Sequence, residues 1–153
     1  MKASKGVEMT LTSLPFDPAT IPWIPLGPGE SFKPLRFLAN RGRALLLRLE
    51  PGTIVPRHRH LGEVHGFNLS GYRRLIETDE IVGPGGYVYE PAGNVDSWMA
   101  VGDEPVVVHI VSFGAMEYLG EDGTVLRRDT PSSLLETYLS YCKANGVTPL
   151  ELR

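Results

Sequence analysis

Cysteine is nearly absent from this chain, and long apolar runs are absent altogether. Cys142 is the only cysteine among 153 residues, so no disulfide can form within the chain, which fits a reducing cytoplasm. No segment approaches the roughly 20 consecutive apolar residues that a membrane-spanning helix needs. The first eight residues hold a basic pair with no apolar run behind it, which argues against a secretory signal. We therefore expect a cytoplasmic protein with no membrane partner.

Excess charge of either sign is also lacking. Lys and Arg number 15 against 18 Asp and Glu, which gives a net charge of −3. A general nucleic-acid binder needs a basic face, so we expect no nucleic-acid partner. Apolar residues make up 42% and charged residues 22% of the chain, which is typical of a globular protein. The length suits a single domain over residues 1–153.

Glycine and proline, by contrast, are abundant. The 17 glycines and 13 prolines form about a fifth of the chain, against an average near 12%. Short apolar runs recur between them at a spacing of about 8–12 residues, which indicates an all-β sandwich or barrel. Ser70-Gly71 separates two of these runs and predicts a tight hairpin turn there. The runs cover residues 44–49, 64–69, 72–77, 86–90, 97–101 and 106–113.

The two ends of the chain differ from this pattern. Residues 1–34 carry six prolines, and we expect an extended arm there, anchored by Trp23 and Ile24, that adds an edge strand. An apolar stripe at helical spacing over residues 131–145 predicts one C-terminal helix, which covers the barrel or makes a subunit contact. Thr130 is suited to cap this helix and Gly146 to end it. The barrel is then expected over about 35–128 and the helical segment over 130–146.

Three of the four histidines lie within eight residues. Side chains alternate along a strand, so His58 and His60 point to one face while Arg57 and Arg59 point to the other. Two imidazoles on one face, with His65 a short loop later, are typical of a metal site. The alternative is a solvated basic segment.

Two spaced motifs extend this histidine pattern. Gly52, five residues, His58-Arg59-His60, four residues, His65 and then Gly71 resemble the first cupin motif. Gly85, five residues, Pro91-Ala92-Gly93, two residues and Asp96 resemble the second. The resemblance covers about residues 23–128. It is similar to small single-domain cupins of the dihydroxyacetophenone and acetylacetone dioxygenase type, and to the cupin half of ChrR anti-sigma factors. It implies a double-stranded β-helix, a jelly-roll barrel with a metal inside.

The resemblance also implies a ligand set, with two departures from the motifs. His65 stands where the first motif usually has Glu, and Asp96 stands where the second usually has His. The implied metal ligands are His58, His60, His65 and Asp96. Asp96 binds directly, acts through a water, orients a ligand histidine, or is only a turn residue. If Asp96 binds and His65 does not, the remaining two His and one carboxylate form the triad typical of non-haem Fe(II) oxygenases.

The activity implied by the resemblance is oxygen-dependent cleavage of a C–C bond in a small chelating diketone or hydroxyketone. Fe(II) is the expected cofactor, while the same ligands also suit Zn, Ni or Mn. The expected catalytic residues are Asp96 and His65, the partners are the substrate and O₂, and a homodimer is the default. The alternatives are a Zn-binding sensor or structural domain of the ChrR type without turnover, and a non-oxidative Zn or Mn isomerase or lyase. Five aromatic residues are candidates to wall the pocket, with plain core packing as the alternative: Phe67, Tyr72, Tyr87, Tyr89 and Trp98.

Overall fold

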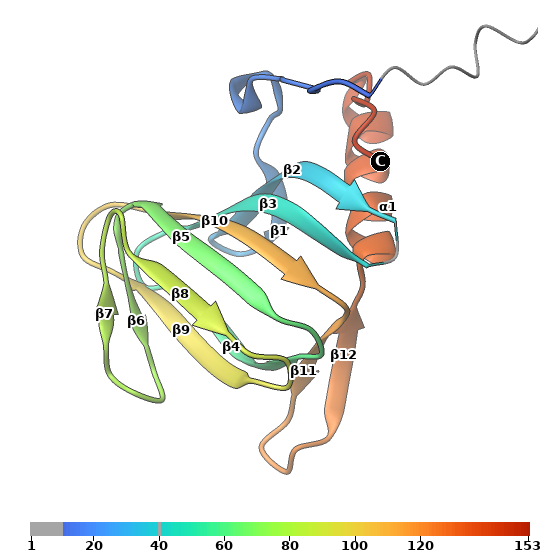
Figure 1. The fold of residues 1–153 in the computed structure, drawn as a ribbon. Coiled ribbons are helices and arrows are strands. Elements are labelled where there is room, and N and C mark those ends of the chain that lie inside the picture. The colour runs from blue at the N-terminus through green and yellow to red at the C-terminus, as the bar shows by residue number, and fades with distance from the viewer. Residues whose placement is uncertain (1–10, 40) are drawn as a thin grey trace, which may run out of the picture.

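The protein folds as two antiparallel six-stranded sheets that face each other, closed by one helix (Figure 1). The structure is a computed structural model and describes residues 11–39 and 41–153. The first sheet has the order β1 (Ile24–Gly27), β2 (Glu30–Leu38), β3 (Gly42–Leu49), β10 (Val106–Phe113), β5 (Val64–Ser70) and β8 (Tyr87–Glu90). The second has the order β12 (Val125–Asp129), β11 (Met116–Leu119), β4 (Ile54–His60), β9 (Val95–Val101), β6 (Tyr72–Leu75) and β7 (Ile81–Val82). This architecture confirms the predicted all-β jelly-roll barrel with a C-terminal helix.

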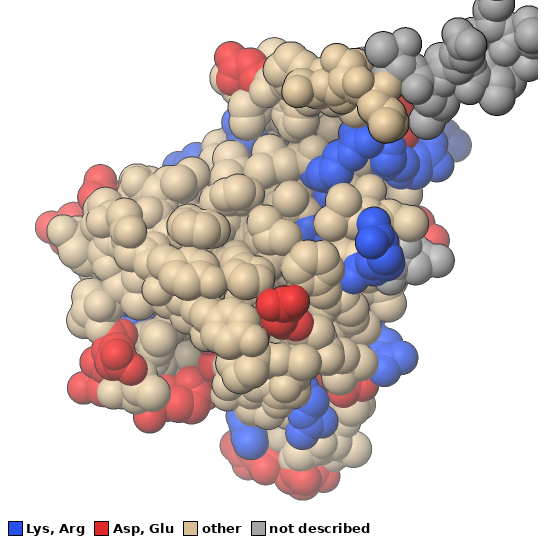
Figure 2. Space-filling model, in the orientation of Figure 1, with Lys and Arg blue, Asp and Glu red and all other residues tan. Residues whose placement is uncertain are grey.

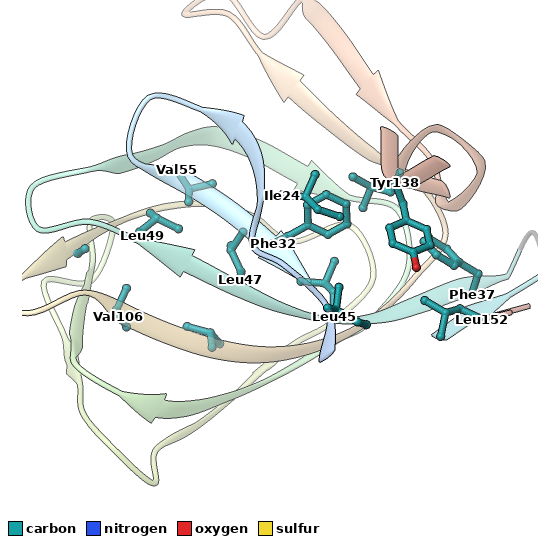
Figure 3. Close-up of a cluster of buried hydrophobic side chains, with 14 of the residues drawn as sticks. Ile24, Phe32, Phe37, Leu45, Leu47, Leu49, Val55, Val106, Tyr138 and Leu152 are labelled. Carbon is teal, nitrogen blue, oxygen red and sulfur yellow. The ribbon is translucent and has the colours of Figure 1, made fainter. Parts of the chain in front are cut away.

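The barrel interior is apolar over much of its length because alternate residues of each strand point inward. In β3, Leu45, Leu47 and Leu49 are buried, while the residues between them are partly exposed. Figure 3 shows these leucines with Phe32 and Val106 in the space between the strands. Burial of this kind contributes roughly 1.5–3 kcal/mol for each large apolar side chain. The apolar core holds the two sheets together.

Helix α1 (Pro131–Asn145) begins and ends where the sequence predicts. Thr130 Oγ1 accepts a hydrogen bond from the Ser133 N–H at 3.0 Å, and the Ser133 hydroxyl accepts one from the Thr130 N–H at 2.8 Å. Gly146 ends the helix in the left-handed conformation, with φ of 65°. Tyr138 is buried against the core, and its hydroxyl accepts a hydrogen bond from the Leu150 N–H at 2.8 Å. The helix therefore packs on the barrel (Figures 1 and 3).

The N-terminal region is part arm and part sheet. A short 3-10 helix, η2 (Pro18–Thr20), precedes β1, which pairs with β2 at the edge of the first sheet. β2 begins at Glu30, inside the region expected to be arm, and includes Pro34. The strand tolerates this proline because its register against β3 shifts between Pro34 and Arg36, so the regular ladder is interrupted there. Residues 1–10 of the expected arm lie outside the described part of the chain.

The predicted hairpin at Ser70-Gly71 is wrong. β5 belongs to the first sheet and β6 to the second, so the chain crosses between sheets here instead of folding back on itself. Gly71 has φ of 70°, and a Cβ at this position would lie 2.4 Å from the Pro105 carbonyl oxygen. The glycine is needed because the crossing passes so close to the loop before β10.

Candidate metal centre

Strand β4 presents two histidines to the barrel interior. His58 is 2% exposed and His60 is 8% exposed, whereas Arg57 is exposed to solvent and Arg59 is partly exposed. The two imidazole rings meet edge to face, with their centroids 4.8 Å apart. The alternation expected from the sequence is therefore present in the structure, and it brings two ring nitrogens into one buried site.

Two carboxylates complete this cluster from neighbouring strands. Asp96 on β9 is the cross-strand partner of His58, and its Oδ1 lies 2.8 Å from His58 Nε2. Glu90 ends β8, and its Oε1 lies 3.8 Å from His60 Nε2. One ligand atom from each of these residues, His58, His60, Glu90 and Asp96, lies within 4.8 Å of all the others.

The contact between His58 and Asp96 has the chemistry of a cation site. His58 Nδ1 lies 2.7 Å from the Pro56 carbonyl oxygen, which can only accept, so Nδ1 carries the hydrogen. In a neutral ring, Nε2 then points a lone pair toward Asp96 Oδ1. That oxygen is buried, and with the His58 proton on Nδ1 it has no hydrogen-bond partner in the described part of the chain. Two electron-rich atoms this close require a proton or a metal ion between them, and imidazole with carboxylate donors suits a divalent transition metal.

Burial and mutual charge set the protonation of the four groups. Burial and the neighbouring His58 lower the pKa of His60 to about 4, so this ring is neutral at pH 7. Burial opposes the charge on His58, but the Asp96 carboxylate outweighs it and raises the pKa of His58. Burial and the charge of Asp96 raise the pKa of Glu90 to about 7. Burial would raise the pKa of Asp96, yet the contact with His58 lowers it. A metal entering this site has to displace protons from His58 and Glu90.

The structure does not bring His65 into the cluster, and this corrects the expected ligand set. In β5, Val64 and Gly66 are buried, so His65 between them points to the outer face. Its Nδ1 lies 2.7 Å from the Tyr87 hydroxyl, and its Nε2 lies 3.1 Å from Glu63 Oε2. His65 lies an odd number of residues after both His58 and His60, so it falls on the opposite face to these two histidines.

Glu90 is the site residue that sequence reasoning missed. It is the cross-strand partner of Val64, next to His65, so the neighbouring strand supplies a carboxylate close to where the first motif usually has one. A signal for it was present in Tyr87-Val88-Tyr89-Glu90. Alternation along this strand places Val88 and Glu90 on the inner face if the two tyrosines are on the outer face.

A cavity of about 750 Å³ opens beside the cluster, a size that suits a small molecule. His58, His60 and Glu90 line it, together with apolar side chains that include Leu47 and Trp98. Of the five aromatic residues expected to wall the pocket, Trp98 does so within the described part of the chain. The other four are on the outer surface, each at least 43% exposed: Phe67, Tyr72, Tyr87 and Tyr89.

Two facing antiparallel sheets with histidines and carboxylates turned inward define a cupin barrel. The chain belongs to the family of ChrR cupin-like domains, whose model matches residues 13–117. No curated protein matches the chain. In the part of the chain that the structure describes, no helix is both long enough and apolar enough to cross a membrane.

Solved structures share the fold over most of the chain. An RmlC-like cupin protein from Ralstonia eutropha JMP134 is 25% identical with a TM-score of 0.86, over 93% of this chain and 94% of that one. An acetylacetone dioxygenase from Acinetobacter johnsonii is 12% identical with a TM-score of 0.72, over 86% and 93%. The structure of Rhodobacter sphaeroides SigE with the anti-sigma ChrR matches 59% of this chain and 47% of that one, at 22% identity and a TM-score of 0.52.

Proposed function

We propose that this cupin is a non-haem Fe(II) dioxygenase that cleaves a C–C bond in a small chelating diketone or hydroxyketone. His58, His60, Glu90 and Asp96 would hold the metal. The observation that carries the proposal is the convergence of these four buried donors at the wall of a cavity large enough for such a substrate.

The donor set suits this chemistry. Two imidazoles and carboxylates with open positions beside them are typical of mononuclear iron oxygenases. Once bound, the metal would act as a Lewis acid toward the two oxygens of a chelating ketone and favour its enolate form. The carboxylates of Glu90 and Asp96 offset the charge of a divalent ion, and the apolar wall that includes Leu47 and Trp98 excludes water. His65 points away from the cavity, so we assign it no catalytic role; Asp96 acts as a ligand.

The family match supports a second candidate function, a metal-binding sensor or structural domain without turnover. The family match is to ChrR cupin-like domains, and a metal-binding domain that senses or only stabilises needs the same four donors. The cavity favours the enzyme, because a purely structural ion does not need about 750 Å³ of space beside it.

One experiment separates the two functions. Protein reloaded anaerobically with Fe(II) is assayed for bound metal and then for oxygen uptake with acetylacetone and a set of small hydroxyketones. Iron-dependent uptake with carboxylic acid products supports the dioxygenase. Tight zinc binding with no uptake under any condition favours the sensor. The double variant His58→Ala/His60→Ala, treated identically, controls for free iron, and failure of the unaltered protein to bind any divalent metal contradicts both functions.

We also propose that the protein is a homodimer that pairs through the outer face of β5 and β8. Figure 2 shows this face as a broad area with few charged side chains. Phe67, Leu69, Tyr87 and Tyr89 are each 43–53% exposed there, and an exposed aromatic group of this size marks an interface. Sedimentation of Tyr89→Glu should show a monomer where the unaltered protein is a dimer. Val125→Glu, an exposed apolar residue on β12, serves as the control and should remain dimeric.

A further inference from the structure

Arg43 is a buried cation inside the barrel, and two of its three guanidinium nitrogens have no hydrogen-bond partner among the described residues. It lies in β3 in phase with the inward-pointing leucines, is 5% exposed, and lines the same cavity as His58 and His60. Its Nε and Nη1 are buried and form no hydrogen bond with any described residue. An unpaired buried guanidinium is costly to fold, so its presence calls for a group that satisfies it.

The nearest acidic groups do not satisfy Arg43. Asp129 is close enough to influence the pKa of Arg43, but its Oδ2 is engaged by Arg127 Nη2 at 3.3 Å. Tyr118 is a neutral phenol at pH 7, as any tyrosine is at its ordinary pKa of 10, and burial raises its pKa further, to about 12. Glu30 also lines the cavity; burial raises its pKa, and the charges that act on it are those of Arg127, Asp129 and His58, with Arg43 not among them. The positive charge of Arg43 is thus left facing the cavity.

A second unpartnered donor lies beside Arg43. Ser112 on β10 is its direct cross-strand partner, and residues in such pairs have Cβ atoms about 4.5–5.5 Å apart on the same face. Ser112 is 3% exposed, lines the cavity, and its Oγ has no hydrogen-bond partner among the described residues. A guanidinium next to a hydroxyl, both buried and both with donor atoms unpartnered among the described residues, matches the donor pattern that binds a carboxylate.

This pair and the metal cluster share one cavity. Burial first, and then the charges of His58 and Arg43, lower the pKa of His60, so Arg43 lies within electrostatic reach of the cluster. A ligand seated in the cavity can therefore meet both the cluster and the Arg43–Ser112 pair.

We propose that the substrate is an acid: a chelating ketone that also carries a carboxylate, which Arg43 and Ser112 bind. This rests on the proposed function for the metal-chelating half of the substrate. The carboxylate half depends only on the two unpartnered donors.

The test compares two ligands that differ at one end. Succinylacetone and butyrylacetone have the same length and the same β-diketone, but a carboxylate in the first replaces the terminal methyl of the second. Titration calorimetry with zinc-loaded protein, which cannot turn over by oxidation, should show that Arg43→Met weakens binding of succinylacetone by about tenfold or more. Binding of butyrylacetone should stay within about twofold. Arg41→Met, an exposed arginine two residues away, serves as the control and should change neither ligand.

Three further measurements keep the outcome clear. Arg43→Met should unfold at the same or a higher temperature than the unaltered protein without ligand, because it removes a buried unpaired charge. Ser112→Ala should weaken the binding of succinylacetone by a few fold and leave the binding of butyrylacetone unchanged. This variant provides the test if Arg43→Met does not fold. In metal-free protein the Arg43 dependence of succinylacetone binding should persist, at weaker affinity.

The outcomes distinguish the two proposals. If no metal binds but Arg43→Met still lowers the affinity for succinylacetone in metal-free protein, the proposed function fails and the carboxylate site stands. If metal binds and both variants treat the two diketones like the unaltered protein does, the carboxylate site is overturned and the metal centre stands.

Discussion

His58 Nε2 lies 2.8 Å from Asp96 Oδ1 across the β4–β9 pair, while His58 Nδ1 is held by the Pro56 carbonyl. The backbone contact fixes which nitrogen faces the carboxylate, so the pair holds either a proton or a metal ion. In metal sites, the hydrogen bond made by one ring nitrogen of a histidine commonly orients the other nitrogen toward the ion, as Nδ1 of His58 does here for Nε2. The metal centre and the protonation of the cluster are therefore two states of one arrangement.

Asp96→Asn should lower zinc affinity by about tenfold or more, because the amide has lost the charge that offsets the ion. Asp96→His should retain metal binding, since an imidazole replaces one donor with another. Competition with a chromogenic chelator measures both. Asp103→Asn, in the exposed turn before β10, is the matched control and should behave like the unaltered protein. Unchanged affinity in Asp96→Asn would exclude the Asp96 carboxylate as a metal ligand.

Two histidine variants distinguish the observed cluster from the one expected from the motifs. His60→Ala removes a buried donor and should abolish measurable zinc binding at micromolar protein. His65→Ala removes a partly exposed ring that contacts Tyr87 and Glu63, and should leave zinc affinity within about threefold. The zinc content of each variant after dialysis measures both effects. Loss of zinc in His65→Ala would mean that β5 turns the other way in solution.

The positions of His58, His60 and His65 show how far the sequence could predict the site. His58 and His60 lie on one strand, where the two-residue period holds, so their common face follows from the sequence. His65 lies beyond a loop, and the period cannot be counted across a loop. Glu90 joins the cluster only through the pairing of β8 with β5, which is a long-range contact. Alternation placed His58 and His60 on one face, and the motif resemblance named Asp96; neither excluded His65 nor found Glu90.

The fold, too, has features that local sequence predicts and features that it does not. The bounds of α1 follow from local chemistry, because Thr130 caps its start and Gly146 its end. The same kind of reasoning misread Ser70-Gly71, since a tight turn looks alike whether the next strand joins the same sheet or the opposite one. Which sheet a strand joins is decided by long-range pairing and by burial of the inner faces of both sheets, a property of the whole chain.

Phe32→Ala should cost about 3–5 kcal/mol of unfolding free energy, because the ring is fully buried at the centre of the apolar core (Figure 3). Denaturant unfolding of metal-free protein measures it. Ile81→Ala, on an edge strand and 55% exposed, should cost less than about 1 kcal/mol. Equal losses in the two variants would contradict the placement of the core.

The stability of the metal-free protein should fall as pH rises above about 6.5. Below that value two groups oppose each other. Glu90, with its pKa raised from 4.5 to about 7, holds a proton that the unfolded chain has lost, so it weakens the fold as pH rises. His60, with its pKa lowered from 6.5 to about 4, does the reverse. Above 6.5 the stabilising contribution of His60 levels off, because the unfolded chain also loses this proton. The protein continues to lose stability there because folded Glu90 and folded His58, whose pKa is raised from 6.5, give up their protons.

Zinc should reverse this trend, because the metal takes the place of the protons on His58 and Glu90. The rise in melting temperature caused by zinc should therefore be larger at about pH 8 than at about pH 6. Thermal unfolding with and without zinc across this range measures it. The double variant His58→Ala/His60→Ala should show no zinc-dependent rise at either pH. A rise of the same size at both pH values in the unaltered protein would mean that zinc binds without displacing a proton, which the contact between His58 and Asp96 does not allow.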